Sequence, residues 1–106
     1  HAPGSKFINL VLHDNGGNGI GMWSDAPDAE VYGSIIYNNG RQRAHGGYAH
    51  GIYMQNVTGT KRVVDNVLFN QLAYGIHAYT EGSGLTGFHI EGNASFNNGA
   101  TSEARI

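Results

Sequence analysis

The sequence contains no cysteine, only 2 prolines and few charged residues. The absence of cysteine excludes disulfides and thiolate metal sites, but it leaves the compartment open, because repeat folds outside the cell often need no disulfides. Charged residues make up 13% of the chain and the net charge is -2, so the clustered Lys and Arg of a nucleic-acid-binding surface are missing. No apolar run approaches the length that spans a bilayer. We therefore expect neither a nucleic-acid partner nor a membrane partner.

Glycine is the abundant residue, at 17 of 106 positions. Because proline is rare, this glycine content does not indicate collagen or a disordered Pro/Gly segment, and its regular placement is typical of turns. A chain of this length is at most one domain. We expect residues 1–106 to form a single all-β unit, since no stretch has the period of an amphipathic helix.

Two short phrases alternate along the chain. The first is Gly-Ile-x-Met/Ala, which begins at Gly19, Gly51 and Gly75. The second is an aromatic residue followed by Asn and a polar residue, with its aromatic positions at Tyr37, Phe69 and Phe96. Successive copies lie roughly 24 to 32 residues apart, a spacing typical of stacked repeat units.

The apolar runs between these phrases are short and rich in β-branched and aromatic residues, which predicts short strands. Aligning the copies places like residues in columns, and we expect these columns to stack inside a narrow core. The columns are Ile20, Ile52 and Ile76; Val31, Val63 and Ile90; Ile35, Val67 and Ala94; and Tyr37, Phe69 and Phe96. A further column consists of Asn38, Asn70 and Asn97, whose side chains we expect to hydrogen-bond from one copy to the next.

The phrase Val-x-x-Asn-x-x-Phe-Asn, clearest over residues 63–70, resembles the repeat of the right-handed parallel β-helix, the pectate-lyase-like fold of many secreted polysaccharide-acting proteins. The resemblance covers about residues 6–99 and concerns the fold. It implies a solenoid of about four coils, and a secreted or cell-surface location follows from the resemblance alone. The chain is shorter than such helices usually are and has no evident cap. We therefore expect a segment incomplete at one or both ends, covered by further coils or other copies of the chain.

Side chains alternate between the two faces of a strand, so an inward isoleucine column predicts an outward patch on the same strands. Its members are Gly21, Trp23, Tyr53, Gln55, His77 and Tyr79. Aromatic faces and hydrogen-bonding groups on an exposed sheet suit a sugar chain. We expect Trp23, Gln55, Tyr79 and Arg43 to bind a polysaccharide, with the loop at residues 41–50 as a rim and Gly21 leaving room for the ligand. The alternative is ordinary outward packing against loops.

Proton-handling residues lie in the same patch. Lyase or epimerase chemistry on uronates needs a base, an acid and a group that neutralises the carboxylate. His50, His77 and Tyr53 are the candidate catalytic residues, because histidine titrates near neutrality, and Arg62 or Arg43 is the candidate neutralising group. The alternative is that these side chains only hydrogen-bond within the solenoid.

An acidic loop contains Asp25, Asp28 and Glu30. Carboxylate oxygens are suitable Ca²⁺ ligands, and β-helix lyases of the pectate type use Ca²⁺, but the spacing is not that of a dedicated calcium loop. We expect no metal ligands and no cofactor, with calcium as the alternative.

These features lead to two hypotheses about function. The first is an enzyme that acts on a polysaccharide as a lyase, an epimerase or a glycoside hydrolase. The second is a non-catalytic β-helix segment that binds carbohydrate or serves as a scaffold. The enzyme needs the histidines, tyrosine and arginine to meet, whereas the binding module needs only the aromatic patch.

Overall fold

A computed structural model describes residues 2–41, 49–82 and 84–100. Within these ranges the chain forms short strands and no helix, which confirms the all-β prediction for this part of the chain, and accordingly no helix there could cross a membrane. The strands are β1 (Lys6–Ile8), β2 (Val11–His13), β3 (Ile20–Met22), β4 (Glu30–Tyr32), β5 (Ile35–Tyr37), β6 (Ile52–Met54), β7 (Lys61–Val64), β8 (Val67–Phe69), β9 (Ile76–Ala78), β10 (Phe88–Glu91) and β11 (Ala94–Phe96).

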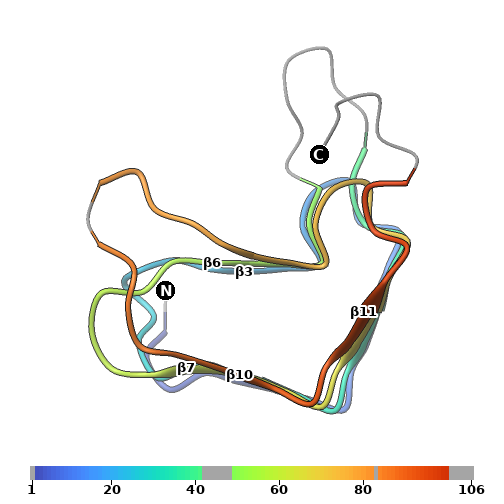
Figure 1. The fold of residues 1–106 in the computed structure, drawn as a ribbon. Helices are drawn as coiled ribbons and strands as arrows, with labels where there is room; N and C mark the ends of the chain where they lie inside the picture. Colours follow the sequence, from blue (N-terminus) through green and yellow to red (C-terminus); the bar gives the residue numbers. More distant parts are fainter. Residues whose placement is uncertain (1, 42–48, 83, 101–106) are drawn as a thin grey trace.

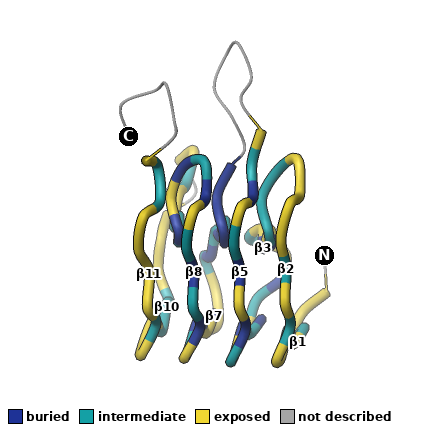
Figure 2. Tube along the Cα trace, turned by 90° about the vertical axis from the view of Figure 1, so that its right-hand side faces the viewer, coloured by how far each residue is buried: buried dark blue, intermediate teal, exposed yellow. Residues whose placement is uncertain are grey.

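The strands form three parallel sheets, in the orders β1-β4-β7-β10, β2-β5-β8-β11 and β3-β6-β9. Each strand pairs with the strand three places later in the chain, so three successive strands make one layer and the layers stack in register. Figure 1 looks along this stack, and Figure 2 shows the strands of successive layers side by side. Stacked parallel sheets of this kind are compatible with a β-helix.

The strands are short because residues with a left-handed backbone interrupt them at equivalent corners. One corner follows the second strand of each layer and is occupied by Asp14, Asn38, Asn70 and Asn97, with φ between 52° and 56°. Asn and Asp tolerate this conformation better than other residues that have a Cβ atom. The residues of this column therefore turn the chain at the corner that follows the second strand of each layer. Its side chains also meet in one case, where Asn97 Nδ2 donates to Asn70 Oδ1 at 2.5 Å.

The predicted isoleucine column lies in the core. Ile20 pairs with Ile52, and Ile52 pairs with Ile76. Ile52 is completely buried, Ile20 is buried, and Ile76 is partly buried against the same cluster. Val31 and Val63 are also completely buried, as predicted, whereas Ile90 of the same column is 48% exposed because β10 is the last strand of its sheet.

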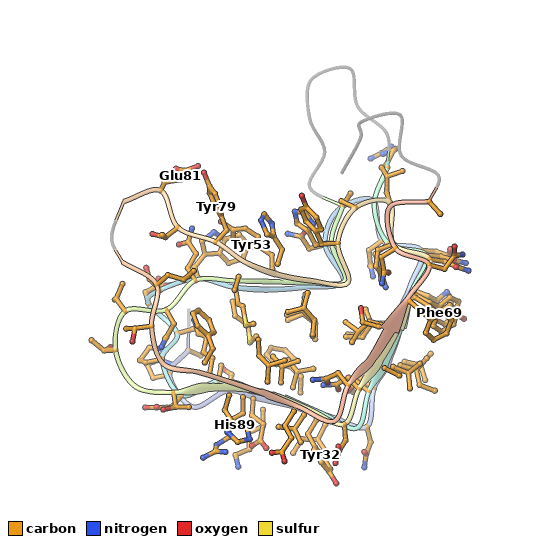
Figure 3. All side chains as sticks on the ribbon, in the orientation of Figure 1. Tyr32, Tyr53, Phe69, Tyr79, Glu81 and His89 are labelled. Carbon is orange, nitrogen blue, oxygen red and sulfur yellow. The ribbon has the colours of Figure 1, made fainter. Side chains whose placement is uncertain are left out.

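Two predicted core columns point the other way. In β5 the buried residue is Ile36, and its neighbours Ile35 and Tyr37 face outward. The column of Tyr37, Phe69 and Phe96 therefore stacks on the outer surface, where Phe96 is 54% exposed and Figure 3 shows Phe69 outside the ribbon. The column of Ile35, Val67 and Ala94 lies outward too. The placement inside the core was wrong because every residue of β5 is apolar, so alternation gives no sign of the inward side.

The outward aromatic column is a regular stack. The ring centroids of Tyr37 and Phe69 lie 5.1 Å apart, and those of Phe69 and Phe96 lie 5.3 Å apart, with nearly parallel planes. His13 continues the stack, 4.8 Å from Tyr37. We call these four residues, His13, Tyr37, Phe69 and Phe96, the aromatic ladder. Nearly parallel rings at the spacing of the layers form stacked contacts, which stabilise aromatic pairs.

Buried amides connect the layers behind this sheet. Asn15 Nδ2 donates to Asn39 Oδ1 at 2.8 Å, and Asn39 Nδ2 donates to Gln71 Oε1 at 3.0 Å. Gln71 continues the row through its backbone N–H, which donates to Asn98 Oδ1 at 3.1 Å. Asn39 and Gln71 are almost completely buried, and buried amides need such partners. The interlayer hydrogen bonds expected of the asparagine column are thus made chiefly by the next residue along the chain.

The glycines of the Gly-Ile phrase are explained by close packing of the layers. A Cβ atom on Gly19 would lie 2.7 Å from the carbonyl oxygen of Gly51, and one on Gly51 would lie 2.6 Å from that of Gly75. Such contacts are too short for any other residue. The repeat in the sequence therefore reflects the approach of one layer to the next immediately before β3, β6 and β9.

Candidate functional site

The predicted outward patch lies on the outer face of the sheet formed by β3, β6 and β9. Tyr53 pairs in register with Gly21 on one side and with His77 on the other, opposite in direction to the buried isoleucines. Trp23 and Tyr79, which follow β3 and β9, are 44% and 43% exposed. Figure 3 shows Tyr53 and Tyr79 together on this side of the ribbon. The structure thus brings together the aromatic residues that the sequence placed on one face.

The rings of this face contact one another in sequence across three layers. Trp23 and Tyr53 have centroids 5.8 Å apart, Tyr53 and His77 5.7 Å, and His77 and Tyr79 5.3 Å. Their planes are tilted by between 32° and 70°. We call Trp23, Tyr53, His77 and Tyr79 the aromatic surface. Because its rings are tilted, this surface exposes parts of ring faces as well as edges.

The space above Gly21 is occupied. A Cβ atom on Gly21 would lie 2.6 Å from Cη2 of Trp23, so the indole lies directly over the glycine backbone. The expectation that Gly21 leaves room for a ligand was therefore wrong. Instead, the missing side chain lets the Trp23 indole lie over Gly21, with its ring centroid 5.8 Å from that of Tyr53, and this extends the aromatic surface onto β3.

Gln55 orients the hydroxyl of Tyr53. Its Nε2 donates to the Tyr53 hydroxyl oxygen at 2.8 Å. Because that oxygen accepts this bond, the hydroxyl proton of Tyr53 remains available to donate to a further group. The predicted binding residue Gln55 thus lies in the patch, where it acts at least through Tyr53.

His50 lies beside the aromatic surface, with its ring centroid 4.3 Å from that of His77, and is almost completely buried, with 7% of its surface exposed. Its Nδ1 accepts a hydrogen bond from the backbone N–H of Tyr74 at 3.2 Å. Its Nε2 lies 2.9 Å from Nδ1 of His77. Since Nδ1 of His50 is an acceptor, the proton of the neutral ring belongs on Nε2, which then donates to His77. His77 in turn carries its own proton on its other nitrogen, Nε2.

The surroundings keep both histidines neutral. Burial lowers the pKa of His50 from 6.5 to about 4, and the neighbouring His77 lowers it as well. Burial also lowers the pKa of His77. Because transfer from water disfavours a charged ring, the pair carries no charge at neutral pH.

Lys61 supports the same face, and sequence reasoning missed it. Its side chain is completely buried. Its ammonium group donates to the backbone oxygens of Met22, Trp23 and Gln55 at 2.5–3.2 Å. Three acceptors match the three protons of an ammonium group, although burial lowers the pKa of Lys61 against an opposing effect of Asp25. Lys61 thereby positions the segments that carry Trp23 and Gln55.

A lysine in a strand is normally expected to point to solvent. The available signal was its position two residues before Val63, which gives both side chains the same inward direction.

The predicted positive groups do not join the patch. Arg62 lies on β7, in the sheet formed by β1, β4, β7 and β10, which is not the sheet of the aromatic surface. The placement of Arg62 near the histidines was therefore wrong. Arg43 and most of the predicted rim at residues 41–50 lie outside the described residues.

The acidic loop uses its carboxylates within the fold. Asp28 Oδ1 accepts a hydrogen bond from the backbone N–H of Thr60 at 2.8 Å, and Glu30 lies 3.3 Å from the ammonium group of Lys6. Across residues 2–41, 49–82 and 84–100, no group of three or more His, Asp or Glu side chains is arranged to hold a metal ion.

Chemically, the face offers aromatic rings and neutral hydrogen-bond donors held in place from behind.

Comparison with family models, with curated proteins and with solved structures finds no match to this chain.

Proposed function

We propose that this chain is a right-handed parallel β-helix of about four coils whose aromatic surface binds a polysaccharide without catalysis. The observation that carries the proposal is the unbroken contact of Trp23, Tyr53, His77 and Tyr79 across three layers. Sugar rings pack against aromatic side chains through their apolar faces, and an extended chain of sugars needs an extended row of such rings.

The polar groups of this face support the same conclusion. The hydroxyl of Tyr53, oriented by Gln55, has a proton to donate. Nε2 of His77 also carries a proton when Nδ1 of His77 accepts the hydrogen bond from His50. Directed donors beside aromatic rings suit the hydroxyl and ring oxygens of a glycan, which accept hydrogen bonds.

Catalysis by His77 is the second candidate, and the 2.9 Å contact between the two histidines favours it because paired titratable groups are common in active sites. A base at Nε2 of His77 would require a proton on Nδ1 of that ring. This proton would oblige His50 to accept at Nε2 and to carry its proton on Nδ1, facing the N–H of Tyr74. Two donors would then oppose each other, so binding explains the geometry better than base catalysis.

The proposal includes the surroundings of the chain. β1 and β10 form the two edges of one sheet, and β2 and β11 form the edges of another. Unpaired parallel edges favour further pairing, so we expect further coils or other copies of this chain to cover them. A secreted or cell-surface location follows from the β-helix resemblance alone, and the binding needs no cofactor.

The experiment is a binding and turnover screen on a panel of uronate and neutral glycans, with and without a chelator. Binding without unsaturated products at ultraviolet wavelengths is expected. Trp23→Ala should weaken that binding about tenfold or more, as loss of a central aromatic anchor does. Tyr32→Ala is the matched control, because Tyr32 is 40% exposed but lies on β4, in a different sheet.

Four results would contradict the proposal or redirect it. Equal loss in both variants would remove the aromatic surface as the site, and no binding across the panel would leave the scaffold role. Turnover that disappears in His77→Ala would establish the enzyme instead. A requirement for Ca²⁺ would indicate that the acidic loop holds a calcium ion.

A further inference from the structure

Three groups form a chain of hydrogen bonds that ends at the aromatic surface. The backbone N–H of Tyr74 donates to Nδ1 of His50, and Nε2 of His50 contacts Nδ1 of His77. The backbone N–H of His50 is held as well, since it donates to Asn18 Oδ1 at 3.0 Å. The first donor is a peptide N–H, which cannot become an acceptor. The direction of the whole chain is therefore set by the backbone.

The proton count along this chain permits one arrangement of neutral rings. His50 has its proton on Nε2 and gives it to the bond with His77, and His77 has its proton on Nε2 at the outer side. A further proton on His77 must enter at Nδ1, where it meets the Nε2–H of His50. If His50 moves its own proton to Nδ1, that proton meets the N–H of Tyr74. No arrangement of the protonated pair keeps both hydrogen bonds.

We infer that protonation of the His50–His77 pair breaks one of its two hydrogen bonds, either the bond that holds His77 or the bond between Tyr74 and His50, and that acid thereby rearranges the aromatic surface. The reason for a visible effect is the position of His77, which contacts Tyr53, Tyr74 and Tyr79 with ring centroids 4.8–5.7 Å apart. A ring that turns at this central place changes the contacts of all three tyrosines.

The groups packed around the pair come from β3, from β6 and from the segments on either side of β9. β3 contributes Gly21 in the same register, β6 contributes Tyr53, and the segment before β9 contributes Tyr74, which stacks on His50 at 5.3 Å. β9 is followed by Tyr79 and, two residues further, by the carboxylate of Glu81, labelled beyond Tyr79 in Figure 3. The charge that acts on His50 is that of His77. Burial acts on both rings in the same direction, against protonation.

The decisive experiment is an NMR titration of the intact chain labelled with ¹⁵N in histidine and in the backbone. At neutral pH, long-range proton–nitrogen correlations should show both rings protonated at Nε2 and unprotonated at Nδ1. On acidification, both histidines should titrate below the ordinary value of about 6.5. The Tyr74 amide and the ring signals of Tyr53 and Tyr79 should move with the first of these titrations.

The double variant His50→Gln with His77→Gln is the matched control. A glutamine at position 50 can accept from the Tyr74 N–H through Oε1 and donate through Nε2, so it replaces the neutral ring without titrating. The acid shift of the Tyr74 amide should disappear in this variant. Should the double variant fail to fold, His77→Gln alone leaves His50 in place and should remove only the step that belongs to His77.

Either of two results would overturn the inference. One is a proton on Nδ1 of either ring at neutral pH. The other is titration of the rings while the Tyr74 amide and the tyrosine signals stay unchanged. Neither measurement uses a glycan, so the outcome is separate from that of the proposed polysaccharide binding.

Where a glycan from the panel binds, this inference extends the proposed function to its pH dependence. Affinity for that glycan should change by about 3- to 10-fold between pH 7.5 and pH 4.5, which corresponds to one hydrogen bond. The change should be absent in His77→Gln. A constant affinity in the parent chain would separate the rearrangement from the binding site and remove this extension.

Discussion

The outer faces of two sheets carry aromatic rows of opposite character. The aromatic ladder repeats one arrangement through four layers, with interplanar angles of 4–7° and centroids 4.8–5.3 Å apart. The aromatic surface repeats nothing: each layer places a different residue at the position of Tyr53, and the rings are tilted. In a parallel stack, neighbouring rings cover each other's faces, whereas tilted rings leave part of their faces exposed to solvent. In this chain the proposed binding surface coincides with the departures from the repeat rather than with the repeat itself.

The two faces also differ in what lies behind them. Leu68 and the amide of Gln71 lie behind the ladder, in a region of neutral side chains that the sequence repeats. The aromatic surface is supported by a buried lysine and a buried histidine, each without an equivalent in the other layers. Burying such groups is unfavourable unless every donor has a partner. We therefore expect the two faces to respond differently to mutation and to pH.

The largest effect is expected from a core residue beneath the aromatic surface. Ile52→Ala should lower the free energy of unfolding by about 2–5 kcal/mol, because the side chain is completely buried and leaves a cavity. Ile35→Ala is the control on the outer side of the ladder sheet, because Ile35 is 42% exposed. Denaturant titration measures both. An equal loss in the two variants would contradict the assignment of inner and outer sides.

A second loss of similar size is expected at Lys61. Lys61→Met keeps the length of the side chain and removes the ammonium group, leaving three buried backbone oxygens without this donor. The free energy of unfolding should fall by about 3 kcal/mol, and Trp23 fluorescence should change because its segment is released. The neighbouring Arg62→Met, on the exposed side of β7, should change little. A stable Lys61→Met with unaltered fluorescence would show that the lysine does not position the face.

An intermediate effect is expected from acid. In the unfolded chain His50 binds a proton near pH 6.5, whereas in the folded chain it resists protonation until about pH 4. The unfolded state therefore binds more protons between these values, and stability falls as the pH falls from about 6.5 to 4, with no further contribution from His50 below that.

The loss is on the order of 2 kcal/mol. Denaturant titrations at several pH values should show it, and His50→Gln should flatten this part of the profile. A profile equally steep in His50→Gln would assign the acid sensitivity to other groups.

The smallest effect is expected in the aromatic ladder. Phe69→Ala removes two stacking contacts on the outer surface and should cost about 1 kcal/mol beyond the lost area. Glycan binding should be unchanged, in contrast to Trp23→Ala. Loss of binding in Phe69→Ala would show that the ladder, and not only the aromatic surface, contacts the ligand.

The predictions from the sequence succeeded where alternation was visible and failed where it was not. In Ile20-Gly21-Met22 and Ile52-Tyr53-Met54, large aliphatic residues flank a different kind of residue, so the inward side was evident. In Ile35-Ile36-Tyr37 all three residues are apolar, and the recurrence of an aromatic residue was mistaken for a sign of burial. The aromatic residues do recur in register from layer to layer, but they stack on the outer surface and not in the core.

By itself the sequence determined the all-β character, the stacking of like residues and the outward direction of Trp23, Tyr53, His77 and Tyr79. These follow from local periodicity, which acts over two residues within a strand and over one repeat between strands. Only the tertiary structure decided that Arg62 belongs to another sheet, that Lys61 is buried and that His50 meets His77 at hydrogen-bonding distance. The physical reason is that side chains 27 residues apart come together through the exact offset of one layer on the next. That offset is set by packing and backbone pairing across the whole stack, and no local pattern contains it.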